Sequence, residues 1–233
     1  MGLSNFNWSF EWAVLITISR IALSDGASFQ AAKSQVGLDQ HQVRRWDSWH
    51  RRWMASGAGM VAGRVRRVTV RPIRIIGDAV LRAECDTVTS FDRELRDLVT
   101  DLMDTLLGAP GRAGVAANQI GVSARVFVYD ADGRRGHVVN PTIEVSEETQ
   151  DGDEGCLSIP DLYFPTPRAM HATVTGFDQH GEPLTVSGSG FLARAFQHEV
   201  DHLAGRLYVD GLTGQTRREA LREIRAAPWS RRP

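Results

Sequence analysis

Cysteine is almost absent from this sequence, since the 233 residues include only Cys85 and Cys156. Two thiols are too few for the disulfide framework that stabilises small secreted proteins, so the composition argues against that class. A reducing compartment is expected instead, with the cytoplasm as the default. A thiol stays reduced there and is available as a metal ligand.

Long apolar runs are also missing. The longest one near the start, Trp12 to Leu23, is interrupted by Arg20 and is shorter than the ~20 residues that a membrane helix needs. No basic flank precedes it and no clear small-residue cleavage site follows it, which argues against a secretory signal. We therefore expect no membrane partner.

The chain as a whole lacks an excess of either charge. A formal net charge of -1, with 42% hydrophobic and 24% charged residues, is ordinary for a globular protein and indicates no polyanion partner. The distribution is uneven, because residues 1–67 carry a net charge of +5 and residues 68–233 a net charge of -6. A glycine-rich stretch, residues 56–63, lies near this change and is a candidate linker.

Hydrophobic periodicity predicts helices and short strands in the second part of the chain. Thr89 or Ser90 is expected to cap the first of these helices, and Asp132-Gly133 is expected to form a turn between strands. The strands together suggest a small mixed sheet. The expected helices cover residues 90–107, 190–205 and 215–226, and the expected strands cover residues 70–76, 125–129, 137–140, 142–145, 172–177 and 184–186.

The strongest chemical signal is His198-Glu199-Val200-Asp201-His202 inside the second expected helix. Two histidines four residues apart leave the same helix face, one turn or ~6 Å apart, and can chelate one metal ion. Glu199 flanks that face and is placed to accept a proton from a water at the metal. Chance alone gives on the order of 0.01 such patterns per chain of this composition, so a metal site is favoured.

Two histidines leave an open coordination sphere, so a third ligand is required. Cys156, within Glu154-Gly155-Cys156-Leu157-Ser158, offers a thiolate. Gly155 would let the backbone come close to the ion, and the Leu157 amide could donate to an oxyanion. A free cysteine by itself is more often a small buried apolar residue. The histidine pair and the flanking motif are what favour a metal ligand here.

A third motif, residues 114–119, reads Gly-Val-Ala-Ala-Asn-Gln. Small residues that end in an amide side chain suit a wall along which a substrate backbone lies, with Gln119 donating to a developing oxyanion. A tight turn with close packing is the alternative for the same residues.

These three motifs, in this order, resemble those of the peptide deformylases, which remove the formyl group from the N-terminal methionine of new bacterial proteins. The resemblance covers residues 70–226 and implies an α+β fold, with small antiparallel or mixed sheets packed around a central metal-binding helix and with a C-terminal helix. It implies one divalent ion, iron(II) with zinc or nickel as substitutes, held by Cys156, His198 and His202. It also implies an N-formylmethionyl peptide or nascent chain as substrate and a transient ribosome contact.

The resemblance also assigns roles around the metal. Gln119 and the Leu157 amide would hold the formyl oxygen, while Ala113 and Gly114 would run beside the substrate as an added strand, near Gly155. Arg168 falls where the family often has an arginine, and it is placed to pair with Asp201. Two positions depart from the pattern: Arg112 stands where the family usually has a glycine, and Tyr163 stands where some members carry a substrate-facing arginine.

Residues 1–53 do not resemble a deformylase. Residues 29–53 are similar to the C-terminal end of an insertion-sequence transposase, although no catalytic acidic triad is visible. We therefore expect an N-terminal extension over residues 1–53, a linker over 54–69 and a catalytic domain over 70–233.

Two alternatives stay open at the level of sequence. A zinc peptidase would use the same histidine pair with Glu219 or Glu223 as third ligand. A nucleic-acid-binding protein would use the Arg- and Trp-containing start, with a structural metal site. No specific nucleic acid is expected for the deformylase.

Overall fold

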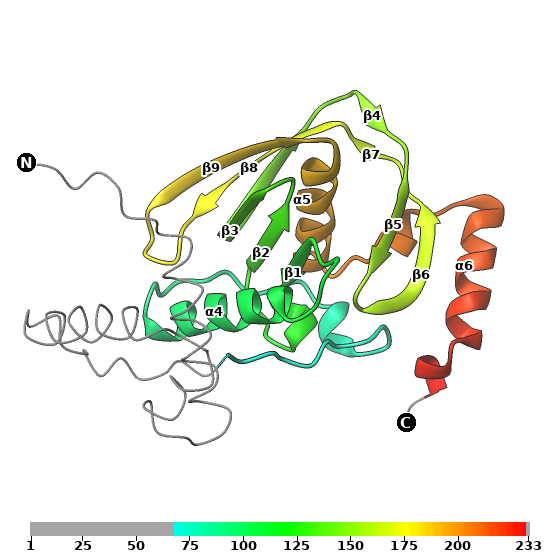
Figure 1. Cartoon of the computed structure of the whole chain (residues 1–233), viewed down its shortest axis with the longest axis horizontal. Helices are drawn as coiled ribbons and strands as arrows, with labels where there is room; N and C mark the ends of the chain where they lie inside the picture. Colours follow the sequence, from blue (N-terminus) through cyan, green and yellow to red (C-terminus); the bar gives the residue numbers. More distant parts are fainter. Residues whose placement is uncertain (1–67, 232–233) are drawn as a thin grey trace, which may run out of the picture. The chain divides into compact units, whose positions relative to one another are not determined.

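The computed structural model describes residues 68–231, and the expectations for residues 1–53 and for most of the linker lie outside this range. Three layers follow one another (Figure 1). A helix, α4 (Arg93–Leu107), covers one face of a five-stranded sheet, and a second helix, α5 (Gly190–Leu203), covers the other face. A third helix, α6 (Gly214–Ala226), packs on a separate ribbon of two strands.

The main sheet has the strand order β1-β2-β3-β8-β9, and all pairings in it are antiparallel. Two further antiparallel ribbons, β4–β7 and β5–β6, lie beyond α5. The strands are β1 (Gly114–Ala116), β2 (Val126–Ala131), β3 (Arg134–Val145), β4 (Thr149–Gln150), β5 (Asp153–Cys156), β6 (Ile159–Pro165), β7 (Arg168–Ala169), β8 (His171–Phe177) and β9 (Pro183–Ser189). Four short 3₁₀ helices complete the described chain: η1 (Ala79–Leu81), η2 (Ala117–Ile120), η3 (Tyr208–Gly211) and η4 (Pro228–Arg231).

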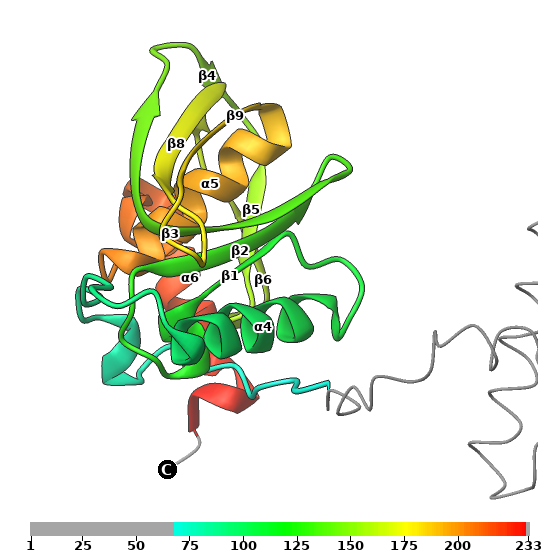
Figure 2. The ribbon, with the colours of Figure 1, turned by 90° about the vertical axis from the view of Figure 1, so that its left-hand side faces the viewer.

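Alternation along β2 explains why both faces of the sheet carry a helix. Val126 and Val128 pack in the cluster under α4, whereas Phe127 and Tyr129 pack in the cluster under α5. Side chains of a strand alternate between faces, so an uninterrupted apolar run predicts a strand buried on both sides. Figure 2 shows the two helices on opposite sides of β2.

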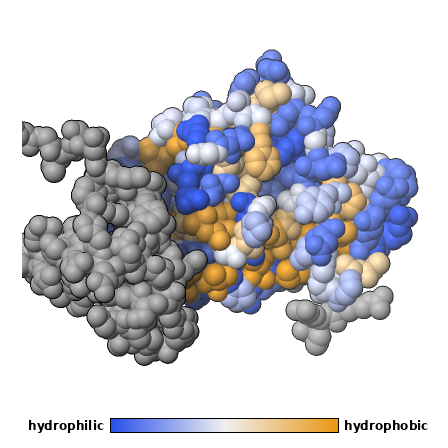
Figure 3. Space-filling model, viewed as in Figure 1, coloured by the Kyte–Doolittle hydropathy of each residue, from blue (hydrophilic) through white to orange (hydrophobic). Residues whose placement is uncertain are grey.

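A third apolar cluster joins the β5–β6 ribbon to α6 and to η3. Its buried members include Ile159 and Phe164 from β6, Tyr208 from η3 and Ala220 from α6. This cluster packs the ribbon that carries Cys156 against α6 and η3. The surface of α6 in Figure 3 is mostly hydrophilic, as its many arginines imply.

The fold agrees with the expected α+β class, with the sheets of the described residues in their antiparallel form. Three local expectations were wrong. Residues 70–76 form no strand, because their amides bond to other segments: Arg71 N donates to Thr105 Oγ1, Arg74 N to Gln119 O and Ile76 N to Ser158 O.

The other two corrections concern where elements begin and end. Asp92, not Thr89 or Ser90, caps α4, because its carboxylate accepts from Leu95 N over 3.1 Å. The two strands expected over residues 137–145 are one strand with a register shift at Asn140, whose φ of 51° bends the chain. Among residues 68–231, no helix is long and apolar enough to span a bilayer.

Candidate metal centre

The two histidines of α5 and the thiol of β5 meet at one point. His198 Nε2 and His202 Nε2 lie 3.1 Å apart, and Cys156 Sγ lies 3.2 Å from His202 Nε2. One ligand atom from each residue falls within 4.8 Å of the other two. The structure therefore brings together the three metal ligands that the sequence predicted, from elements 46 residues apart in the case of Cys156 and His202.

The donor set fits a divalent transition metal. Donor atoms around one tetrahedral ion lie roughly 3.3 to 3.6 Å apart, close to the separations here. Burial disfavours the Cys156 thiolate, but the positive charges of His202 and His198 outweigh it and hold the thiol pKa well below its ordinary value. Ser158 N also donates to Cys156 Sγ over 3.3 Å. Two imidazoles and a thiolate suit Zn, Fe or Ni better than Mg or Ca.

Glu154 fixes the orientation of His198, a role that the sequence analysis missed. Glu154 Oε1 lies 2.6 Å from His198 Nδ1, and the carboxylate is only 4% exposed. A carboxylate on one imidazole nitrogen holds the proton there and leaves Nε2 as the ligand. Burial opposes its ionisation, but hydrogen bonds from Arg168 and His198 lower the pKa of Glu154 to about 2.

Arg168 pairs with Asp201 over 2.6 Å, as predicted. Its guanidinium also binds both oxygens of Glu154, over 2.7 and 2.9 Å. The Arg168 and Asp201 side chains are 13% and 19% exposed, so this is a largely buried network and not a surface ion pair. It joins β7 to α5 beside the metal ligands.

Glu199 is almost completely buried, at 3% exposure. Burial raises the pKa of Glu199 to about 7, although the charges of His198 and His202 oppose the rise. Its Oε2 has no hydrogen-bond partner among residues 68–231. A buried carboxylate with a pKa near neutrality and a free oxygen next to the ligand pair is suited to proton transfer.

Gln119 points its amide nitrogen at the centre. Its Oε1 accepts from Ala116 N over 2.9 Å, so its Nε2 faces Ser158 Oγ at 3.2 Å and Cys156 Sγ at 3.6 Å. Leu157 follows Cys156 in the turn between β5 and β6, with Ser158 buried after it. The amide donor and this turn therefore border the same sulfur.

The expected substrate wall, Ala113 and Gly114, lies at an edge of the sheet. β1 pairs only with β2 in the main sheet, and Ala113 O accepts from Asp130 N over 2.9 Å. On β5, a side chain on Gly155 would overlap with the ring of Tyr163, which is 66% exposed. Arg112, the other departure, donates to the Thr105 carbonyl in the last turn of α4.

Two further residues at the centre were given no role from the sequence, although Asn118 belongs to the motif of residues 114–119. Asn118 Nδ2 donates to His202 O over 2.6 Å and so ties η2 to the end of α5. Arg194 lies on α5 four residues before His198 and contacts Glu154 over 3.2 Å. A lone Asn or Arg has no pattern of spacing, so only the fold reveals these contacts.

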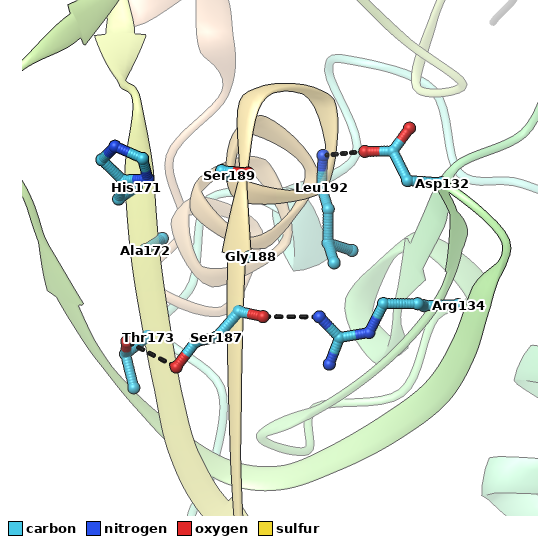
Figure 4. Close-up of a pocket in the computed structure, with 9 residues that line it drawn as sticks. All are labelled: Asp132, Arg134, His171, Ala172, Thr173, Ser187, Gly188, Ser189 and Leu192. Atoms are coloured by element: carbon cyan, nitrogen blue, oxygen red, sulfur yellow. Dashed lines mark hydrogen bonds between the residues drawn. The ribbon is translucent and has the colours of Figure 1, made fainter.

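The alternative third ligands and the pocket beside α5 do not belong to this site. Glu223, one alternative third ligand, is exposed on α6, and Glu219 accepts a hydrogen bond from Gln215. A pocket of ≈ 420 Å³ lies at the N-terminal end of α5, where Leu192 N donates to Asp132 Oδ2 (Figure 4). The two histidines of the candidate metal centre lie in the second half of the same helix, away from this pocket, and Cys156 lies on β5.

A largely buried Cys-His-His cluster, with two histidines on a helix, a thiol on a neighbouring strand and an ionisable carboxylate beside them, is an arrangement typical of a metal-dependent hydrolase. The family model described as polypeptide deformylase matches residues 70–218. The chain belongs to the peptide deformylase family, metal-dependent hydrolases that remove the N-formyl group from nascent peptides. This finding favours the deformylase over the zinc peptidase.

Individual relatives agree with the family match. A peptide deformylase of Acidothermus cellulolyticus is 55% identical over 163 residues, which are 70% of this chain and 90% of that protein. The crystal structure of a peptide deformylase from Legionella pneumophila is 38% identical, with a TM-score of 0.64, and covers 71% of this chain and 100% of that chain. The peptide deformylase from Thermus thermophilus is 40% identical, with a TM-score of 0.63, over 67% and 94% of the two chains.

Proposed function

We propose that this chain removes the formyl group from N-terminal formylmethionine of new polypeptides with one metal ion held by Cys156, His198 and His202. The observation that carries the proposal is the approach of the three ligand atoms within 4.8 Å of one another. A divalent ion held there supplies Lewis acidity, which lowers the pKa of a water molecule and polarises the formyl carbonyl.

Glu199 is the proposed proton carrier. It takes the proton of the attacking water and delivers it to the amine that leaves, which balances the hydrolysis of the amide to formate and a free amino group. Its burial and its pKa of about 7 support this role, because the same group then accepts and returns a proton near neutral pH.

Gln119 and the Leu157 amide are the proposed donors to the formyl oxygen as negative charge develops on it. The support for Gln119 is that Ala116 N binds its Oε1 and leaves Nε2 directed at the centre. Because η2 is buried and tied to α5 through Asn118, the amide keeps this position without reorganisation.

The peptide part of the substrate is proposed to lie between Ala113 and Gly114 on one side and Gly155 on the other. β1 is an edge strand, and an extended peptide can add to such an edge through main-chain hydrogen bonds. The guanidinium of Arg112 binds the end of α4 and so leaves this edge open.

Iron(II) is the proposed native metal, and zinc(II) or nickel(II) can take its place. The thiolate and imidazole donors accept all three ions, so availability decides between them. We further propose a cytoplasmic location, a transient contact with the ribosome, and residues 70–233 as the catalytic domain after the extension and linker. The low cysteine content and the family match from residue 70 support these points.

The test is formate release from a formyl-methionyl peptide by full-length protein prepared anaerobically with iron(II). The Glu199→Ala variant is expected to retain its metal but to lose turnover by several orders of magnitude, while the wild type turns over. A wild type that binds the metal and releases no formate would contradict the proposal. Retained turnover in Glu199→Ala would contradict the role of Glu199 alone.

A further inference from the structure

Arg194 is a buried cation that the proposed reaction does not use. It lies one helical turn before His198, so the two side chains leave α5 on the same face. Arg194 is only 6% exposed. Burying a guanidinium is costly unless it is paired and hydrogen-bonded, so its contacts must explain why it is there.

The guanidinium bridges a main-chain carbonyl and a carboxylate. Arg194 Nη1 donates to Thr166 O over 2.6 Å and to Glu154 Oε2 over 3.2 Å. The other oxygen of Glu154 lies 2.6 Å from His198 Nδ1. A continuous path of hydrogen bonds therefore runs from the backbone between β6 and β7, through Arg194 and Glu154, to a histidine of the metal centre.

Arg194 anchors Glu154 to the main chain, which Arg168 does not do through its bonds to Glu154 and Asp201. Arg168 also binds both oxygens of Glu154, but its guanidinium is shared with Asp201, and these hydrogen bonds go to side chains. Arg194 instead takes its position from the fixed carbonyl of Thr166. The Glu154 carboxylate therefore accepts hydrogen bonds from both Arg168 and Arg194.

The local chain is shaped around this guanidinium. Gly152 adopts φ 146°, and an ideal Cβ on it would lie 3.2 Å from Arg194 Nη2, tighter than an ordinary contact. A side chain at this position would press on the guanidinium and on its bond to Glu154. The backbone next to β5 therefore leaves room for Arg194.

We propose that Arg194 is a positioning residue for the metal centre, which holds Glu154 so that His198 keeps its Nδ1 proton and presents Nε2 to the ion. This inference rests on the proposed metal site. It concerns retention of the ion, so it can be tested separately from the deformylase reaction.

The experiment compares full-length Arg194→Met and Arg194→Lys with the wild type, all loaded with zinc(II). The rate of zinc loss to a chelator is measured together with the ¹⁵N chemical shifts of the histidine rings. We expect Arg194→Met to lose zinc roughly 10- to 100-fold faster, the usual effect of removing a group that orients a metal ligand. The His198 signals should shift, and kcat should fall with little change in KM.

Arg206→Met is the matched control, because Arg206 binds the same network through Asp201 Oδ1 but its side chain is 60% exposed. It should lose zinc at the wild-type rate. Arg194→Lys should recover part of the retention, since an ammonium group can still donate to Thr166 O and Glu154. If Arg194→Met fails to fold, Arg194→Lys decides the question by the same measurements.

Reduced thermal stability with a wild-type rate of zinc loss and unchanged His198 signals would overturn the proposal and leave Arg194 a structural residue. Faster zinc loss in a protein whose wild type releases no formate would keep this inference and contradict the proposed function. The two failures are thus distinguishable.

Discussion

The carboxylate of Glu199 occupies the space in which a side chain at position 114 would lie. An ideal Cβ on Gly114 would overlap with the carboxylate and would come within 2.8 Å of Glu199 Cγ. Gly114 has no positive φ that would itself require glycine, so the reason for glycine here is close approach. Gly114 of the edge strand therefore packs directly against Glu199, the proposed proton carrier.

Gly114→Ala should therefore displace Glu199 and lower activity. A shift of ~1 Å in a catalytic group is enough to reduce the rate roughly 100-fold. We expect kcat for formate release to fall by about this factor while zinc content stays at one ion per chain. Gly211→Ala is the control, because a Cβ there meets nothing within 4 Å. Equal activity of the two variants would show that Glu199 adjusts without consequence.

Cys156→Ala tests the third ligand against the second thiol of the chain. Removal of the Cys156 thiolate leaves two imidazoles, and we expect metal content after dialysis to fall to near zero and activity to be lost. Cys85→Ala should keep both, because Cys85 is a buried core residue in a different cluster. Metal analysis by mass spectrometry checks both variants. Retained metal in Cys156→Ala would return the zinc peptidase to consideration.

Glu154→Gln should destabilise the protein as well as the metal site. The amide leaves Arg168 and Arg194 buried without their carboxylate, and breaking a buried charge pair costs about 3–5 kcal/mol. Denaturant unfolding and zinc retention measure the two effects. Glu148→Gln is the control, because Glu148 is 65% exposed and pairs with the exposed His171 at 3.5 Å. Its unfolding free energy should change by less than about 0.5 kcal/mol.

The raised pKa of Glu199 predicts how the stability of the metal-free protein depends on pH. Its pKa is about 7 in the folded state against an ordinary value of 4.5, so the folded state binds the extra proton between these values. The stabilisation is fully present below pH 4.5 and is lost as pH rises through about 7. Glu199→Gln stays neutral throughout. The stability of the variant relative to the wild type should therefore increase from pH 5 to pH 8 in denaturant titrations, and a constant difference would contradict the raised pKa.

Deletion of residues 1–67 tests the proposed domain division. The described residues contain the three apolar clusters and all the residues of the metal centre. A variant that begins at Val68 should therefore retain kcat/KM for a formyl-methionyl peptide. A large loss of activity with intact metal content would mean that the N-terminal part contributes to catalysis.

The metal centre was the most predictable part of the molecule, because its chemistry depends on residue type. His198, Glu199 and His202 have a spacing that fixes a common helix face, and Cys156 supplies the donor that the pair lacks. Arg194 and Asn118 have no such signature. Their roles depend on which carbonyl or carboxylate the fold places beside them.

The apolar pattern also gave wrong secondary structure where the main-chain hydrogen bonds go to distant segments of the chain. Residues 70–76 have the apolar content of a strand, but their amides bond to α4, η2 and the β5–β6 turn instead of to a neighbouring strand. The ribbons β4–β7 and β5–β6 were not predicted, since strands of two to seven residues with charged or proline positions give little periodicity. The strands and helices with continuous apolar faces, such as β2 and α4, were predicted to within a few residues.

The candidate metal ligands come from two parts of the chain that belong to different apolar clusters. His198 and His202 belong to the helix held by the main sheet, and Cys156 belongs to the ribbon held by α6. A metal ion bound by all three residues would link α5 to the β5–β6 ribbon. A chelator should therefore make the ribbon susceptible to proteolysis before the helix unfolds, so that metal supply would govern how long each molecule survives as well as how fast it works.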